Sequence, residues 1–252
     1  MITCKNCNNQ FEGQYCNNCG QSADTERLDF KFLLKNLHKN FLKYFHKGIF
    51  YASRQLFTRP GHSIREYIEG KRVNHFEPIG LLISFAAFYG VLYHTFGINM
   101  FSGITDNALD GKLDFRSVDN LITDHFAVVT LLFVPVYSIG SFLSFRKQGY
   151  NFYEHIYLNT FLASQRLLIR IATFPLLVIL DGTENIFLFR DLLILADIVL
   201  MVWSYTQFFN KVKRIKAVLL SVLSYAIFYA ILYATFFTAC YKSSAYRIWL
   251  RN

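Results

Sequence analysis

Four cysteines near the start of the chain have the spacing of a metal site. Cys4 and Cys7 form one C-x-x-C pair, and Cys16 and Cys19 form a second pair after a short loop. Two tight turns of this kind can each present two thiolate sulfurs to one tetrahedral zinc ion. Because four protein ligands leave no open coordination position, we expect a structural zinc (Zn) and not a catalytic one. Disulfides are the alternative, which a reducing cytoplasm disfavours.

A second group of polar residues lies inside two apolar stretches. Gln165, Arg166 and Arg170 fall in the first stretch, and Asp197 falls in the second. A charge near the centre of a bilayer costs about 2.5–3.5 kcal/mol, so each should have a partner. Folding the two stretches about Thr183 brings Arg170 level with Asp197, which predicts an ion pair between them.

Arg166 then lacks an acidic partner within the membrane. It could bind an anion such as a lipid phosphate or a substrate carboxylate, with Gln165 adding polar contacts. Alternatively, the charges are purely structural, and Arg166 extends its long side chain toward the cytoplasmic face.

A third group lies in the block from Leu56 to Arg72. Pro60 suits the first turn of a short helix and Gly70 suits the position past its end. The basic residues of this block nearest the membrane, Arg59, Lys71 and Arg72, are candidates to bind the phosphate of a lipid headgroup.

The same short helix carries His62, Glu66 and Glu69 on one face, at spacings that could hold a cation. The alternative is that Arg65 and Glu69 form an ordinary i, i+4 pair and that these charges only solvate the helix.

The composition indicates what must position these groups. Of 252 residues, 53% are hydrophobic and only 17% are charged. A soluble domain carries about a quarter of charged residues, so this chain has too few to cover a surface in water. Disorder is excluded by the same apolar content. The composition predicts an all-α integral membrane protein.

Five stretches are candidates to span the membrane, since a hydrocarbon core about 30 Å thick needs roughly 20 apolar helical residues. Three carry no formal charge: Pro78 to Met100, Phe126 to Phe145 and Ala217 to Tyr241. The two that hold the charges above are Ile156 to Leu180 and Ile186 to Phe209. A polar turn at residues 181–185 joins these two into a predicted helical hairpin.

The chain therefore divides into four parts. We expect a zinc ribbon over residues 1–22, basic amphipathic or interfacial helices on the cytoplasmic side over 23–77, a domain of about five transmembrane helices over 78–241, and a C-terminal tail over 242–252.

Within the second part, residues 28–57 combine apolar residues at helical spacing with a lysine at every fourth position. The lysines are Lys31, Lys35, Lys39, Lys43 and Lys47. Such a helix suits the headgroup layer, with its lysines on anionic lipid. The alternative is a helix packed on the membrane spans. Nucleic acid is the weaker candidate for a partner of these basic residues, because it leaves the apolar face without a use.

Lysine and arginine near the ends of the spans predict the orientation. They precede the first span and follow the second and fourth, whereas the loop after the first span is acidic. This alternation puts the N-terminus in the cytoplasm and the C-terminus outside, although the tail after the fifth span also carries basic residues.

The order of these motifs resembles a known family. A short C-x-x-C…C-x-x-C-G ribbon, followed by L-F-T-R-P-G-x-x-I-x-x-Y-I-x-G-K-R ahead of several spans, is similar to the bacterial membrane family catalogued as domain of unknown function 3667. The resemblance implies this architecture in a bacterial cytoplasmic (inner) membrane, and it implies no reaction.

Three functions remain open. The first is a non-catalytic scaffold or adaptor, whose ribbon and basic helix recruit a cytoplasmic protein partner or anionic membrane lipid. The second is a transporter of a small solute, ion or lipid that uses the charges of the hairpin. The third is a lipid-modifying enzyme, which we do not favour because the chain carries no recognised catalytic or nucleotide-binding motif. Nothing in the sequence indicates whether the protein is a monomer or an oligomer.

Overall fold

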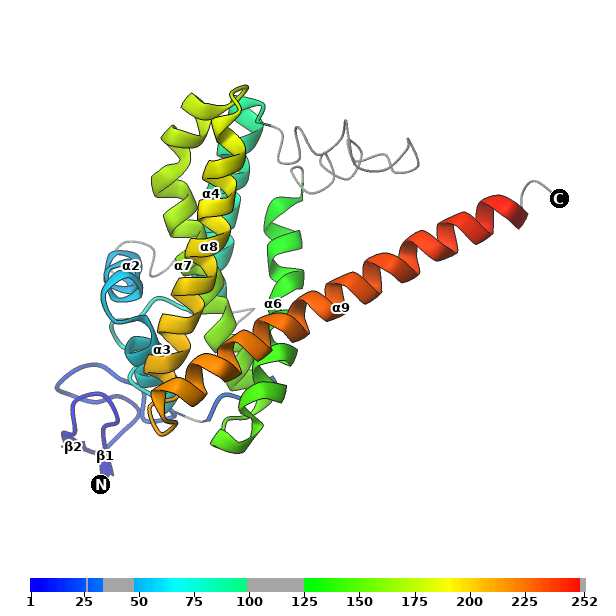
Figure 1. The fold of residues 1–252 in the computed structure, drawn as a ribbon. Coiled ribbons are helices and arrows are strands. Elements are labelled where there is room, and N and C mark those ends of the chain that lie inside the picture. The colour runs from blue at the N-terminus through cyan, green and yellow to red at the C-terminus, as the bar shows by residue number, and fades with distance from the viewer. Residues whose placement is uncertain (26, 34–47, 99–124, 250–252) are drawn as a thin grey trace.

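The computed structural model describes residues 1–25, 27–33, 48–98 and 125–249. A small ribbon lies at one end of a helical bundle, and the last helix runs obliquely away from it (Figure 1). The ribbon contains two short antiparallel strands, β1 (Ile2–Thr3) and β2 (Gln10–Phe11). The remaining elements are α2 (Gly48–Thr58), α3 (Pro60–Glu69), α4 (Pro78–Phe96), α6 (Phe126–Phe145), the 3-10 turn η1 (Arg146–Gln148), α7 (Phe152–Leu180), α8 (Asn185–Phe208) and α9 (Arg214–Trp249).

Four helical segments are long and apolar enough to cross a membrane. They are Pro78–Phe96 in α4, Phe126–Gln148 in α6 with η1, Phe152–Leu180 in α7 and Arg214–Thr235 in α9. The prediction of a helical membrane protein is therefore confirmed. Each expected span contains a helix in the described residues. The α6 helix has the expected bounds of Phe126 to Phe145, whereas α4 ends at Phe96 and not at the expected Met100.

Five spans were predicted, and the one that is not among these four is α8. It carries three charged residues, Arg190, Asp191 and Asp197. Its 24 residues nevertheless extend about 36 Å, which is enough to cross the hydrocarbon core. The chain leaves the ribbon end along α7 and starts α9 at the ribbon end again (Figure 1). Between the two it must return, and α8 is the returning helix.

Local signals in the sequence set the helix boundaries near the ribbon. Asn151 and Glu154 form a reciprocal capping box that starts α7. The α3 helix has Pro60 in its first turn and ends at Gly70, whose φ of 113° favours glycine, as predicted.

Close contacts between backbones hold α3 and α9 to the bundle. A Cβ on Gly61 of α3 would lie 2.1 Å from the carbonyl oxygen of Ser204 in α8. In the same way, a Cβ on Gly140 of α6 would lie 2.6 Å from the carbonyl oxygen of Ser224 in α9. Both positions therefore require glycine for the helices to approach this closely.

Residues 34–47 of the predicted basic amphipathic helix, with four of its five lysines, lie outside the described residues. The described parts contact protein. Leu28 is fully buried, Phe32 packs against Tyr157 of α7, and Leu56 of α2 is buried in the same core. These parts follow the alternative of a segment packed on the bundle.

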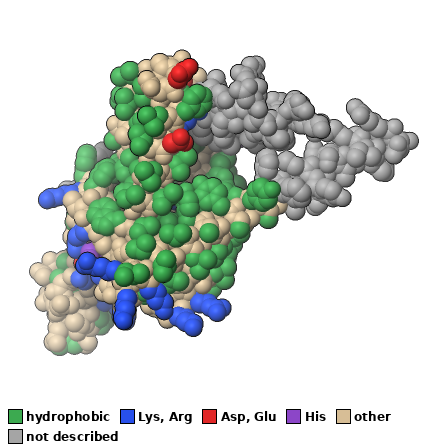
Figure 2. All heavy atoms as spheres, viewed as in Figure 1, with side chains coloured by type: hydrophobic (Ala, Val, Ile, Leu, Met, Phe, Trp, Pro, Cys, Tyr) green, Lys and Arg blue, Asp and Glu red, His purple; other side chains and the backbone are tan. Residues whose placement is uncertain are grey.

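The two ends of the bundle differ in charge. Lysine and arginine side chains gather at the end that carries the ribbon, and acidic side chains occur at the opposite end (Figure 2). Arg146 and Lys147 follow α6, and Lys211 and Lys213 follow α8, all at the ribbon end, whereas Asp181 follows α7 at the other end.

Candidate metal centre

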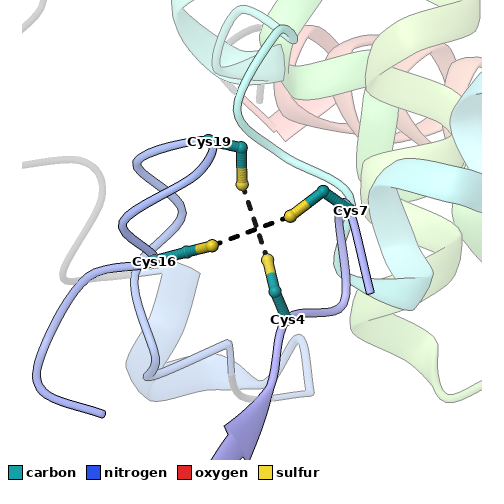
Figure 3. Close-up of side chains that lie close together, drawn as sticks. All are labelled: Cys4, Cys7, Cys16 and Cys19. Carbon is teal, nitrogen blue, oxygen red and sulfur yellow. Dashed lines mark hydrogen bonds between the residues drawn. The ribbon is translucent and has the colours of Figure 1, made fainter. Parts of the chain in front are cut away.

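The four N-terminal cysteines converge on one point, as predicted (Figure 3). Each C-x-x-C pair forms a tight turn closed by a backbone hydrogen bond, from Asn8 N–H to the carbonyl of Cys4 at 2.9 Å and from Gly20 N–H to the carbonyl of Cys16 at 2.8 Å. Asn8 and Gly20 have positive φ values of 59° and 75°, which Asn and Gly tolerate best. This backbone conformation points both sulfurs of each pair inward.

The sulfur positions fit a tetrahedral metal ion. All four sulfurs lie within 4.8 Å of one another, with 3.5 Å between Cys4 and Cys19 and 3.6 Å between Cys7 and Cys16. A zinc–sulfur bond of about 2.3 Å implies roughly 3.8 Å between sulfurs at the corners of a tetrahedron. The four thiols are free and not joined as disulfides. The ribbon can therefore hold one metal ion with all four positions filled by protein.

Backbone amides favour the thiolate form that a metal requires. The N–H of Asn9 lowers the pKa of Cys7. Burial raises the pKa of Cys16, but the N–H groups of Cys19 and Asn18, together with the side chains of Cys7 and Cys19, outweigh it and lower that pKa to about 6. In contrast, burial raises the pKa of Cys19 to about 11, so this thiol depends more than Cys7 or Cys16 on a cation to lose its proton.

The ribbon is fixed to the bundle through the end of α3. Gln21, which follows the second cysteine turn and is 3% exposed, donates from its side-chain amide to the carbonyl of Gly70. Its side-chain oxygen accepts from the N–H of Arg72 at 3.2 Å. Lys5, between Cys4 and Cys7, packs its aliphatic chain on Gly70. Sequence analysis missed this contact, because nothing in the local pattern distinguishes Gln21 from an exposed glutamine.

The three residues expected to bind lipid phosphate mostly contact protein. Both Nη nitrogens of Arg59 donate to the carboxylate of Glu66, Nη2 at 3.0 Å and Nη1 at 3.2 Å. The guanidinium of Arg72 lies 4.5 Å from the ring centre of Phe32 and donates to the carbonyl of Tyr67. Of the three, only Lys71 is exposed, whereas Arg59 and Arg72 are half-buried. For Arg59 and Arg72 the structure therefore supplies partners that the headgroup hypothesis did not anticipate.

The possible cation site on α3 is not assembled. Glu66 pairs with Arg59, and Arg65 Nη2 contacts His62 Nδ1 at 2.9 Å while its Nε lies 3.9 Å from Glu69. Among the described residues, the cysteine set is the one group that brings three or more metal-ligating side chains together. Arg65 instead donates to the carbonyls of Gln207 and Phe208, which caps the end of α8.

The predicted ion pair in the hairpin is confirmed. Arg170 Nη2 of α7 and Asp197 Oδ2 of α8 lie 2.5 Å apart. The guanidinium of Arg166 lies 4.2 Å above the ring of Tyr137 in α6, a favourable cation–π contact. The cavity beside Arg166 and Asp197 has about 10 Å³, room for a single water and not for a phosphate or carboxylate ligand.

Gln165 is fully buried and joins three helices. Its amide donates to the carbonyl of Leu56 at the end of α2, and its oxygen accepts from Ser204 of α8 at 3.3 Å. This hydrogen bonding gives Gln165 a structural role in the bundle.

A buried polar network links α6, α7 and α8. Ser141 Oγ and His155 Nδ1 lie 2.9 Å apart, Asn159 donates to Ser141, and Tyr205 donates to Asn159 at 2.7 Å. A serine beside a histidine is the arrangement of an activated nucleophile. Here both are buried, Ser141 at 0% and His155 at 1% exposed, so neither side chain is open to the surface. The network is a means of packing polar side chains between helices.

Fold and cysteine centre together define a helical membrane protein with a small metal-binding ribbon. The family model for a protein of unknown function, DUF3667, matches residues 47–90, a segment that contains α2, α3 and most of α4. The resemblance predicted from the Leu56 to Arg72 block is thereby confirmed for this segment. No curated protein and no solved structure matches the chain.

Proposed function

We propose that this protein is a non-catalytic adaptor of the bacterial cytoplasmic membrane, which presents a zinc ribbon to a cytoplasmic protein partner. The observation that carries the proposal is the closed four-cysteine centre held against the end of the bundle by Gln21. With four protein ligands, the metal has no position for a substrate, so its contribution is a fixed shape.

The exposed side of the ribbon supports a docking role. Tyr15 lies between the two cysteine pairs and is 66% exposed, and Ile2 is 44% exposed. Exposed apolar and aromatic residues on a small polar module are typical of a contact surface. The charge distribution supports a cytoplasmic N-terminus and an external C-terminus, because the basic loops lie at the ribbon end (Figure 2).

Transport and lipid chemistry have less support. The space around Arg166 holds about one water, and the buried Ser141–His155 pair is not open to the surface. Neither observation favours a second function.

The proposal is tested with the full-length protein purified from membranes in mild detergent. We expect one zinc per chain by elemental analysis, and its loss in Cys16→Ser. We also expect Tyr15→Ala to lose a copurifying cytoplasmic protein while it keeps the zinc and the melting temperature. Asn17→Ala, an exposed polar position of the same turn region, is the matched control.

Two outcomes would contradict the proposal. One is a protein that binds no metal when all four cysteines are reduced and intact. The other is a copurifying set that is the same for Tyr15→Ala, Asn17→Ala and the unmodified protein.

A further inference from the structure

A cleft of about 520 Å³ lies at the seam between ribbon and bundle. Segments far apart in the sequence build it. Lys5 comes from the ribbon, Glu69 from the end of α3, Tyr150 from the link between α6 and α7, and Lys211 from the link between α8 and α9. A volume of several hundred cubic ångströms is that of a site for a small ligand.

The charges that line the cleft leave two cations available. Glu154 is neutralised by Arg27, whose guanidinium donates to both carboxylate oxygens at 2.7 and 2.9 Å. Glu69 lies 3.9 Å from Arg65 Nε. Lys5 donates to the carbonyl of Thr25, a neutral group, at 2.7 Å and so keeps its charge uncompensated.

Lys211 is exposed, and like Lys5 it has no acidic partner within 4 Å in the part of the chain that the structure describes. The cleft thus has two lysines free to bind an anion, above a wall formed by the buried rings of Phe208 and Phe209.

The depth of the cleft indicates which anion is close by. Gly149 and Tyr150 lie between the ends of α6 and α7, and Asn210 and Lys211 lie between the ends of α8 and α9. The ends of membrane helices lie where hydrocarbon gives way to headgroups, and tyrosine favours this level. The cleft therefore opens at the level of the phospholipid phosphates.

We infer that this cleft binds the phosphate of an anionic glycerophosphate headgroup, with Lys5 and Lys211 as its cationic contacts. The site is distinct from Arg59 and Arg72, whose guanidinium groups contact protein. Lys5 lies between two metal ligands, so the ribbon builds one wall of the site. The inference does not rest on the adaptor function, because the ribbon can build this wall whether or not it also recruits a protein.

The test uses full-length protein in phosphatidylcholine nanodiscs, with and without phosphatidylglycerol. Three proteins are compared: unmodified, Lys211→Gln, and the matched control Lys213→Gln, which is exposed on the same loop but does not line the cleft. The readouts are the melting temperature and the retained lipid measured by native mass spectrometry. A parallel series in pure phosphatidylcholine discs adds sn-glycerol 3-phosphate in solution.

We expect phosphatidylglycerol to raise the melting temperature of the unmodified protein and of Lys213→Gln. In Lys211→Gln, the loss of one lysine contact should weaken the binding of phosphatidylglycerol about fivefold. A third outcome is that sn-glycerol 3-phosphate raises the melting temperature through Lys211 whereas phosphatidylglycerol does not. The cleft then binds phosphate, and the natural source of this phosphate is a soluble compound.

Equal responses of Lys211→Gln and Lys213→Gln would mean that only general surface charge attracts the anion, and would overturn the inference. The absence of a response to both probes in the unmodified protein would overturn it as well.

Discussion

The pair formed by Arg170 and Asp197 links the two charged helices within the membrane. Removing one partner of such a pair leaves the other charge without compensation in a medium of low dielectric constant. We expect Asp197→Asn to lower the free energy of unfolding by about 2–4 kcal/mol, measured by thermal unfolding in detergent. The exchange Arg170→Asp with Asp197→Arg should recover part of this loss.

Asp191→Asn is the control for this prediction, because Asp191 lies on the same helix and is exposed. A double exchange no more stable than Asp197→Asn would speak against the pairing. So would a loss of the same size in Asp191→Asn.

His75 should make the stability depend on pH. Its ring lies between those of Tyr51 and Tyr67, at 5.1 and 5.7 Å, and its Nε2 contacts Ser63 Oγ at 2.9 Å. Burial lowers the pKa of His75 to about 4, against 6.5 for a free histidine. Between these pH values the histidine of the unfolded chain binds more protons than that of the folded protein. The contribution of His75 to the free energy of unfolding is therefore fully present above pH 6.5, and it is lost as the pH falls toward 4.

The replacement His75→Gln should remove part of this slope, as measured by melting temperature at a series of pH values from 4 to 7. His94→Gln, at an exposed position of α4, is the control and should keep the slope. An unchanged slope in His75→Gln would assign the pH dependence to other groups.

At the scale of elements, α3 depends on close contact with α8. A Cβ at Gly61 would lie 2.5 Å from Gln207 Cβ as well as 2.1 Å from the carbonyl oxygen of Ser204, so α3 would have to shift. Gly61→Ala should cost about 1–3 kcal/mol or prevent folding. The matched control is Gly90→Ala in α4, where the nearest atom would be Phe126 Cβ at 3.5 Å, an ordinary contact. Equal melting temperatures for the two variants would contradict this packing.

The contact between the ribbon and α3 gives a separate prediction. Gln21→Ala leaves the carbonyl of Gly70 and the N–H of Arg72 without this partner, which should cost about 1–3 kcal/mol. We expect the ribbon of this variant to be cleaved faster by a protease, with the zinc retained. Gln14→Ala, an exposed glutamine of the ribbon, should be cleaved at the unmodified rate. If both variants resist cleavage equally, the side chain of Gln21 does not hold the ribbon in place.

The elements themselves could largely be predicted from the sequence, because their signals are local. Runs of apolar residues gave the bounds of α6, and Pro60 and Gly70 gave those of α3. The metal centre followed from cysteine spacing in the same way. The uses of Gln21, Gly61 and Arg65 could not be predicted, because each depends on a partner far along the chain. The ion pair of Arg170 was an exception, since a hairpin fixes which residues share a depth.

At the scale of the whole molecule, the path of the chain predicts which loops share a side of the membrane. If α8 crosses, Thr183 faces outward and both Lys147 and Lys211 face the cytoplasm. In a Cys240→Ser background, an impermeant maleimide should modify Thr183→Cys in intact cells, and modify Lys147→Cys and Lys211→Cys only after lysis. Because the four ribbon cysteines remain, the labelled position is identified by mass spectrometry of the peptides. Modification of Thr183→Cys and Lys211→Cys under the same condition, with Lys147→Cys under the other, would show that α8 does not cross.

The contact between the ribbon and α3 also bears on how the protein is made, because the ribbon precedes α3 in the sequence. The cysteine turns leave the ribosome before α4 and the helices that follow it, so the ribbon can take up its ion and fold while these helices are still being made. Gln21 is then already in position when Gly70 emerges. The metal centre would thus act during biogenesis as a preformed template, against which the first helices of the membrane domain assemble.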